Sequence, residues 1–392
     1  MHLVFVTSIV PDGSPSTGYE IANAAIVNAL RRAGVQVTVL GYCWPGKKPS
    51  DPQNTVVLGE VDVTTGSAGA MQKVQWLGAA MAGGHTFASA KLRVVGEGSL
   101  RRALGSIGSF DGYVLNAVQM AGAYPHVFTD KPFIYVAHNV EHVSAIQNAD
   151  AASSTFQRFL FRREARLLEA LENRFCRGAE HVFTLSADDS ETLAACAGHD
   201  RFSVLPLVTR EEMPVALPAV ERKCDAALIG TWTWAPNRIG LDWFLTEVTP
   251  FLPAEFSTHV AGSIPGDLRC SHPGVQFVGR VPDATEFVRS AGVIPLASKA
   301  GTGVQLKTIE TFELGLPCVA TASALRGIAH VPANCTVTDD ARTFAGAMVK
   351  QAGTGAVADG RAFHTAQRNE LDRAIEEGIA RLQRVAEAGE AA

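Results

Sequence analysis

The sequence has neither the charge surplus nor the long apolar runs that define several classes of protein. Its 34 Lys and Arg residues against 39 Asp and Glu residues give a formal net charge of -5, so nucleic acid is not an expected partner. No apolar run reaches the roughly 18 residues of a transmembrane helix. The first residues, MHLVFVTSIV, lack the basic segment of a signal peptide and start a strand pattern at once. We expect a cytoplasmic protein, with peripheral contact at the inner face of the membrane left open.

Cysteine pairs with metal-binding or redox spacing are also missing. The seven cysteines are scattered along the chain, and none forms a CxxC pair. An odd, dispersed set is typical of reduced thiols in the cytosol. The chain also has no DxD motif and no internal repeat with a period of 20–50 residues.

Short β-branched runs alternate with helical patterns along most of the chain, which is the pattern of parallel sheets covered by helices. The 392 residues exceed what one core usually holds, so two domains are expected. Prolines and charges without periodicity mark a linker near Val208 to Lys223. We predict an α/β fold with Rossmann-like domains at 1–208 and 222–360, and a helix at 361–392 that packs back toward the first domain. The stretch from Thr64 to Ser109 is expected to hold helical insertions that carry specificity.

The stretch GTGVQLKTIETFELGLPCVAT (Gly301 to Thr321) combines two glycines, a cation and a carboxylate at the start of a helical pattern. Glycines allow close approach of the backbone, and a helix N-terminus attracts phosphate. Lys307 adds a point charge, and Glu310 lies one turn further on, where a carboxylate can accept two ribose hydroxyls. The pattern fits a sugar–diphosphate–nucleoside ligand; a glycine-rich connection with a solvated Lys–Glu pair is the alternative.

This stretch closely resembles the GGGTRLKILEAMAxGxPVVAT signature of GT-B glycosyltransferases of the family 4 kind. LIGTWTWAPNRIGLDWFLTEVTPFL and GVQFVGRVPDATEFVRSAGVIPLASKAGTG resemble neighbouring motifs of that family, as do YVAHNVEH and the helix before HVFTLS. The resemblance runs from about Met1 to Ile328. It implies two Rossmann-like domains that face a central cleft, with the acceptor on the first and the nucleotide sugar on the second.

Residue by residue, the resemblance implies that Glu310 binds the ribose and that Lys307 lies near the donor diphosphate. His138 matches a histidine near the acceptor and the reaction centre. The other implied donor contacts are Gly230, Asn237, Arg238, Val281, Gly301, Thr302, Gly303, Val304 and Gln305, and the acceptor contacts are Gly18, Tyr19 and Glu141.

Two positions depart from the family pattern. Thr302 stands where many members have a further glutamate, which puts recognition of the sugar hydroxyls in doubt. The loop GTWTWAPNRIG lacks the usual Arg and Lys, so Asn237 or Arg238 must substitute or neither does. Arg238 is equally consistent with a solvated arginine of a first helical turn.

The resemblance implies a transferase that moves a sugar from a nucleotide-diphosphate sugar to a hydroxyl of a glycan, lipid-linked or small-molecule acceptor in polysaccharide or glycoconjugate synthesis. A helix N-terminus and Lys307 can stabilise the leaving diphosphate, so we expect no essential metal and no cofactor. His138 or Glu141 can serve as base in an inverting mechanism. The resemblance favours retention, in which the leaving phosphate takes the proton.

Other readings of these motifs remain open. HNVEH (His138 to His142) formally matches the H-x-x-E-H zinc peptidase pattern. The same fold also serves sugar-nucleotide epimerases and could serve a non-catalytic binder. The basic, apolar stretch Phe156 to Arg177 is either an interfacial helix that meets anionic lipid or a helix that buries one face on the sheet and solvates its arginines. The second interpretation is favoured, because Glu164, Glu169 and Glu172 break up the positive charge. The tryptophans of WTW (Trp232 to Trp234) either stack on a sugar or base or pack between the two domains.

Overall fold

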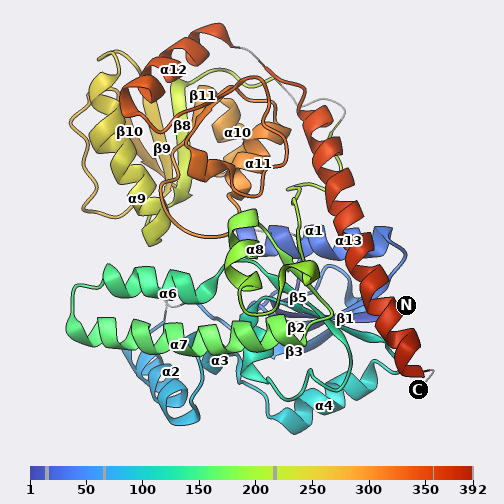
Figure 1. Ribbon diagram of the computed structural model, residues 1–392. Helices are drawn as coiled ribbons and strands as arrows, with labels where there is room; N and C mark the ends of the chain where they lie inside the picture. The colour runs from blue at the N-terminus through green and yellow to red at the C-terminus, as the bar shows by residue number, and fades with distance from the viewer. Residues whose placement is uncertain (14–16, 65–67, 215–218, 356, 391–392) are drawn as a thin grey trace. The chain divides into compact units, whose positions relative to one another are not determined.

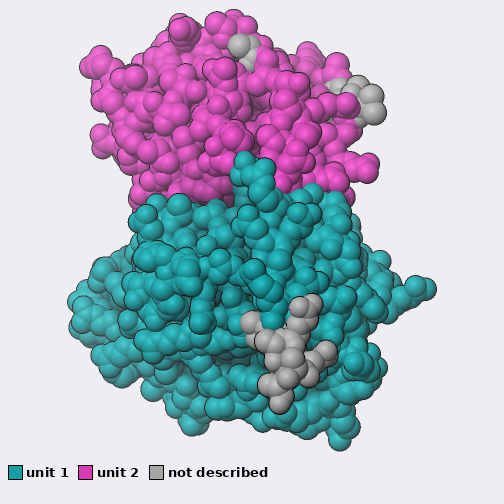
Figure 2. Space-filling model, turned by 45° about the vertical axis from the view of Figure 1, so that its right-hand side comes forward, with its two compact units in different colours: residues 1–207, 370–392 teal, residues 208–369 magenta. Residues whose placement is uncertain are grey.

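The computed structural model covers residues 1–392 and describes 1–13, 17–64, 68–214, 219–355 and 357–390 (Figure 1). The chain divides into two compact units, coloured separately in Figure 2. Unit 1 comprises Met1–Leu207 with Glu370–Ala392, and unit 2 comprises Val208–Asn369. The division falls at the first residue of the predicted linker. Among the described helices, none is long and apolar enough to cross a membrane.

Unit 1 is built on a parallel sheet with the strand order β3-β2-β1-β4-β5-β6-β7. The order reverses between β1 and β4, as in Rossmann-like folds. The strands are β1 (His2–Ile9), β2 (Gln36–Cys43), β3 (Thr55–Glu60), β4 (Gly112–Asn116), β5 (Phe133–Ala137), β6 (His181–Thr184) and β7 (Phe202–Val204). The helices are α1 (Gly18–Arg32), α2 (Ala70–Gly83), α3 (Phe87–Leu92), α4 (Glu97–Ser106), α5 (Val118–Ala123), α6 (Glu141–Asp150), α7 (Thr155–Gly178) and α8 (Ala187–Ala194).

Helices cover both faces of this sheet, because its central strands are apolar on both sides. On one face, strand residues such as Tyr113 and Tyr135 form a core with Leu104 of α4 and Phe175 of α7. The last helix, α13 (Gly360–Glu390), begins in unit 2 and continues in unit 1. There its Asp372 accepts hydrogen bonds from Arg32 of α1, with an Nε to Oδ1 distance of 3.1 Å.

Unit 2 is built on a second parallel sheet with the order β10-β9-β8-β11-β12-β13. Its order reverses between β8 and β11. The strands are β8 (Cys224–Thr231), β9 (Thr258–Ser263), β10 (Val275–Gly279), β11 (Ala291–Leu296), β12 (Cys318–Ala320) and β13 (Cys335–Val337). The helices are α9 (Ala235–Trp243), α10 (Ala284–Arg289), α11 (Leu306–Glu313) and α12 (Ala341–Thr354).

One face of the second sheet packs against α9 and α12 through a core that includes Leu228, Leu241, Phe244, Phe344 and Met348. On the other face, α10 lies against the central strands β8 and β11, and α11 lies against β11. A close approach fixes one position in α9, because a Cβ on Gly240 would lie 2.0 Å from the carbonyl oxygen of Ala297. Packing of α9 thus sets the path of the loop that follows β11.

The predicted α/β fold with two Rossmann-like sheets is confirmed, and each expected strand forms close to its predicted place. The stretch from Thr64 to Ser109 holds α2, α3 and α4, with residues 65–67 outside the described part. The linker prediction covers residues 208–223, of which 215–218 lie outside the described residues. That the two domains face a cleft stays a prediction.

Candidate active site

In unit 2, the sequence-predicted residues gather where the strand order of the sheet reverses. The carboxyl ends of β8 and β11 lie side by side there, and such points are where open α/β sheets bind ligands. The chain leaves β11 at Leu296, runs through a loop and enters α11 at Leu306. The loop contains Gly301, Thr302, Gly303 and Val304, and Gln305 is the N-cap residue.

The glycines of this loop are required by its conformation. Gly301 has φ +99° and Gly303 has φ +73°, both in the left-handed region that other residues rarely adopt. Arg326 holds the loop from the following segment: its Nε donates to the carbonyl of Gly303 at 3.1 Å, and its Nη2 donates to that of Ala300 at 3.3 Å. Because N–H and C=O of a trans peptide point in opposite directions, these bonds turn the N–H groups of Gly301 and Val304 away from Arg326.

A pocket that is partly open to solvent lies between the strand ends and α11. Its walls are mainly apolar, and two charged side chains of α11 reach it. The lining includes Trp232, Leu241, Val288, Pro295, Lys307 and Glu310. An apolar pocket with a few convergent polar groups is the usual form of a small-molecule site.

Lys307 is the cation of this pocket. Its side chain is half-buried, and its Nζ lies 5.7 Å from the centre of the Trp232 ring. The surrounding protein limits hydration of the ammonium, which lowers the pKa of Lys307 from 10.5 to about 8. A weakly hydrated cation has a strong preference for an anionic ligand, so the site is suited to a phosphate.

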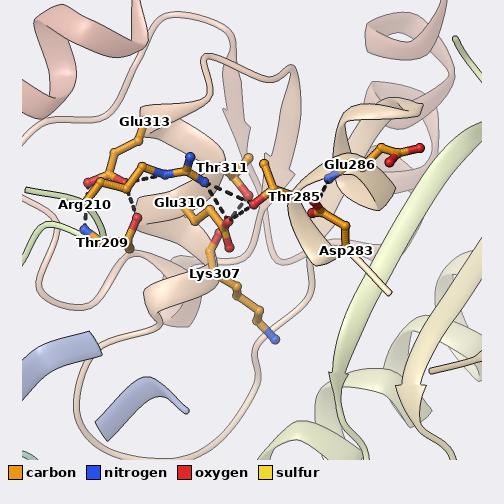
Figure 3. A network of polar contacts seen from close by, with 9 residues as sticks. All are labelled: Thr209, Arg210, Asp283, Thr285, Glu286, Lys307, Glu310, Thr311 and Glu313. Atoms are coloured by element: carbon orange, nitrogen blue, oxygen red, sulfur yellow. Dashed lines mark hydrogen bonds and ion pairs between the residues drawn. The ribbon is translucent and has the colours of Figure 1, made fainter. Parts of the chain in front are cut away.

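Glu310 belongs to a polar network that the sequence did not predict (Figure 3). Its Oε1 accepts hydrogen bonds from Nη2 of Arg210 at 3.0 Å and from Oγ1 of Thr285 at 2.9 Å. Lys307 points away from this network in the same view. The two side chains thus point in different directions from α11, as they must if each is to contact a different part of one ligand.

Glu313, one turn after Glu310, is fully buried and supports the network. It accepts a hydrogen bond from the backbone N–H of Thr209 at 2.8 Å and another from the hydroxyl of that residue. Burial raises the pKa of Glu313 to about 7. The linker is thereby attached to α11.

The other predicted donor contacts have different surroundings. Arg238 pairs with Asp242 at 2.8 Å and Asp267 at 3.0 Å, so a diphosphate would have to compete with two carboxylates for it. Nδ2 of Asn237 donates to the carbonyl of Thr231 at 3.3 Å. Gly230 is the second-last residue of β8 and lies beside the Trp232 ring, which a Cβ would approach to 3.1 Å. Val281 is half-buried just after β10.

In unit 1, the predicted acceptor residues meet a buried network at the ends of β1, β4 and β5. The rings of Tyr19 and His138 lie 5.0 Å apart, measured between centroids. The Tyr19 hydroxyl lies 2.9 Å from Oγ1 of Thr7, and Nε2 of His138 lies 2.8 Å from Oδ1 of Asn116. Gly18 starts α1 directly after its N-cap, Thr17.

This network determines which nitrogen of His138 carries the proton. Nδ2 of Asn23 faces the carbonyl of Ile9, which can only accept, so Oδ1 of Asn23 faces Nδ2 of Asn116 at 2.7 Å. Oδ1 of Asn116 then faces His138, whose Nε2 must donate. Burial lowers the pKa of His138 to about 4, so the ring is neutral with its proton on Nε2.

The zinc interpretation of HNVEH is not supported. His138 lies after β5 and outside α6, which begins at Glu141, so the two histidines do not share a helix. Nδ1 of His142 lies 2.6 Å from a carboxylate oxygen of Glu172. No group of three or more metal-binding side chains occurs in the described parts of the chain. Glu141 accepts from Nε2 of Gln119 at 3.0 Å, and burial together with the nearby Glu172 raises its pKa to about 7.

The tryptophans of WTW have different positions. Trp232 is buried, and its indole N–H donates to the carbonyl of Ala261 at 2.7 Å. Internal packing therefore fixes this ring, although one part of it faces the pocket. Trp234 is 48% exposed.

Sequence reasoning missed Arg210, Thr285, Asn116 and Arg326. Asn116 had a detectable signal, because it is a polar residue at the end of the buried strand GYVLN. Arg210 had none, since it lies in a stretch whose composition indicates only a linker.

The comparisons with known proteins agree with this geometry. Residues 223–352 match the family model described as Glycosyl transferases group 1. No curated protein matches the sequence. Among solved structures, the sucrose-phosphate synthase of Thermosynechococcus elongatus is 15% identical, with 99% of each chain covered and a TM-score of 0.63.

Two further solved structures contain nucleotides. The HepE protein of Anabaena in complex with UDP is 12% identical over 100% of both chains, with a TM-score of 0.56. The catalytic domain of starch synthase IV from Arabidopsis thaliana, bound to ADP and acarbose, is 10% identical over 98% of this chain and 99% of that one, with a TM-score of 0.57. The predicted resemblance is therefore confirmed: the chain has the fold of GT-B glycosyltransferases, and its second unit matches the group 1 glycosyltransferases over residues 223–352.

Proposed function

We propose that this protein transfers a sugar from a nucleoside-diphosphate sugar to a hydroxyl group of an acceptor, in polysaccharide or glycoconjugate synthesis. The observation that carries the proposal is the pocket at the switch point of the second sheet, which Lys307 and Glu310 both line. It matches the chemistry of a ligand with an anionic centre and a ribose. HepE binds UDP and UDP-glucose, and starch synthase IV binds ADP, within the same fold.

The charges of the site support donor activation without a metal. Cleavage of the anomeric C–O bond leaves negative charge on the diphosphate. Lys307 and the N–H groups that begin α11 are positive and fixed before the reaction, so they stabilise that charge as it develops. The sequence also lacks a DxD carboxylate pair. We therefore propose turnover that persists in EDTA.

The first unit would receive the acceptor. Glu141, with a pKa of about 7, could take a hydroxyl proton at neutral pH, whereas the neutral His138 would be a weaker base because its pKa is about 4. Retention is proposed because of the resemblance to family 4, with the leaving phosphate as the proton acceptor. The anomeric configuration of the product, measured by NMR, distinguishes retention from inversion.

Donor cleavage tests the proposed reaction. UDP-, ADP- and GDP-sugars are incubated with mono- and oligosaccharide acceptors and EDTA, and the released nucleoside diphosphate is measured. We expect release with one donor and an increase with one acceptor, and a loss of at least about 100-fold in Lys307→Met, since such electrostatic contacts contribute several kcal/mol. Sugar isomerisation without an acceptor would instead indicate an epimerase. No turnover of any donor that binds would overturn the transferase proposal in favour of a binder.

We also propose that α7 places unit 1 against anionic lipid, so that lipid-linked acceptors are reached at a membrane. The first turns, Thr155 to Arg163, contain Arg158, Arg162 and Arg163 without an acid. Phe156 is 61% exposed and Phe159 is 58% exposed. Two glutamates expected to offset the arginines are buried instead. Glu164 accepts from the N–H of Phe87 at 2.8 Å, and Glu172 accepts from that of Glu141 at 2.7 Å.

Vesicle binding tests the membrane proposal. We expect cosedimentation with vesicles of phosphatidylcholine and phosphatidylglycerol but not of phosphatidylcholine alone, since exposed aromatic and basic residues together favour anionic surfaces. Substitution of Phe156 and Phe159 by serine should abolish it. Val349→Ser, at an exposed apolar residue of unit 2, is the control. Equal binding to both vesicle types would contradict the proposal.

A further inference from the structure

The guanidinium of Arg210 lies between two glutamates that are one turn apart on α11 (Figure 3). Its Nη2 is 3.0 Å from Oε1 of Glu310, and its Nε is 4.0 Å from Oε2 of Glu313. Nη2 also donates to Oγ1 of Thr285 at 3.2 Å. Two carboxylates at this spacing repel each other, and the arginine compensates that repulsion.

The carboxylate of Glu310 is held by one oxygen only. Oε1 accepts from both Arg210 and Thr285, whereas Oε2 accepts no hydrogen bond from a residue in the described ranges. Glu310 also lines the pocket, and 30% of its side chain is exposed. The arrangement resembles a carboxylate that is oriented through one oxygen and offers the other to a ligand.

Arg210 is itself held in place on both sides. Its backbone carbonyl accepts a hydrogen bond from Nε2 of His364 at 2.8 Å, and the preceding residue, Thr209, is bonded to the buried Glu313. The side chain is 24% exposed, and its Nε is buried without a hydrogen-bond partner among the described residues. An arginine fixed in this way loses little conformational entropy when a ligand binds.

We propose that Arg210 is a positioning residue for nucleotide recognition: it orients the Glu310 carboxylate so that Oε2 accepts the ribose hydroxyls of the donor. The inference rests on the proposed function and assigns a role to a linker residue. Arg210 would not touch the nucleotide. Without Arg210, Thr285 would be the remaining hydrogen-bond donor to Glu310, and the negative charge of Glu313 would be uncompensated. The Glu310 carboxylate would then rotate.

The test is the contribution of the ribose hydroxyls to binding affinity, because the proposed role of Arg210 affects only the contact with those hydroxyls. Binding of UDP, ADP and GDP and of their 2′,3′-dideoxy counterparts is measured by calorimetry with the full chain. For the nucleotide that binds, we expect Arg210→Gln to weaken affinity about tenfold to 100-fold, the range for hydrogen bonds to a charged group, and to change dideoxy affinity less than about twofold. Arg210→Lys, which keeps the charge but not the fork, should give an intermediate loss.

Two further variants separate this role from a merely structural one. Arg368→Gln removes another hydrogen bond to the same linker, from Nη1 to the carbonyl of Glu211 at 3.0 Å, and should leave both affinities unchanged. Glu310→Gln should lose the same discrimination between ribose and dideoxyribose as Arg210→Gln. A general effect on folding would instead lower the affinities for the nucleotide and for its dideoxy counterpart equally, and that result would overturn the proposal.

The outcomes also separate this inference from the proposed function. If Glu310→Gln loses ribose discrimination but Arg210→Gln keeps it, Arg210 has no positioning role and the nucleotide site stands. If the wild type binds none of the three nucleotides, the proposed function fails and the inference fails with it.

Discussion

Charge on Lys307 should control how nucleotide affinity depends on pH. Burial places the pKa of this residue at about 8, below its ordinary value of 10.5. The difference corresponds to about 3 kcal/mol of lost hydration, by the usual conversion of pKa into free energy. Only the protonated form attracts a diphosphate, so affinity should fall as pH rises through about 8.

The magnitude follows from the protonated fraction of the free protein. With a pKa of about 8, that fraction is roughly nine tenths at pH 7 and roughly one tenth at pH 9, and the apparent dissociation constant scales inversely with it. We therefore expect nucleoside diphosphate affinity to fall about tenfold between pH 7 and pH 9. Calorimetry at constant ionic strength measures this, because screening by salt would otherwise change as well.

A matched variant isolates the lysine from other titrating groups. An arginine has a pKa of at least about 12, so the guanidinium of the Lys307→Arg variant stays charged over the whole range. The nucleotide affinity of this variant should therefore be nearly constant from pH 7 to pH 9. Lys307→Met should bind weakly throughout that range. Parallel pH profiles for the wild type and Lys307→Arg would refute the reasoning, since the titrating group would then lie elsewhere.

Three other changes test the packing and the buried networks. Gly240→Ala places a Cβ against a backbone carbonyl and should cost about 3 kcal/mol in urea unfolding, whereas Gly346→Ala, with open space in α12, should be neutral or stabilising. Asn116→Asp puts a carboxylate beside Nε2 of His138. The pKa of His138 should then rise from about 4 by roughly one to three pH units, which NMR titration of the imidazole ring detects. Arg32→Ala removes the ion pair with α13 and should cost about 1 kcal/mol, less at high salt.

Much of the fold follows from local patterns in the sequence. Runs such as HLVFVTSI and PFIYVA form buried strands because their apolar residues are continuous, and the glycines at 301 and 303 mark a turn that only a positive φ allows. The position of Lys307 and Glu310 on one helix after β11 was predictable for the same reason.

The parts that could not be predicted depend on contacts between distant segments. Arg210 meets Glu310 across 100 residues of sequence, and Asn116 meets His138 across 22, and neither spacing leaves a periodic signal. Charge patterns also mislead when burial is unknown. The sequence pattern predicts that Glu164 and Glu172 offset the arginines of α7, but both are buried and accept backbone hydrogen bonds.

Nucleotide binding by the wild type and Glu310→Ala tests the central claim most directly. Thermal unfolding is followed with UDP, ADP and GDP, since a ligand of the folded state raises stability by mass action. Glu286→Gln, at an exposed glutamate on α10 that points away from the network in Figure 3, is the control. The account predicts that one nucleotide stabilises the wild type and the control and that Glu310→Ala loses most of the shift. An equal shift in all three proteins, or none in the wild type, would contradict it.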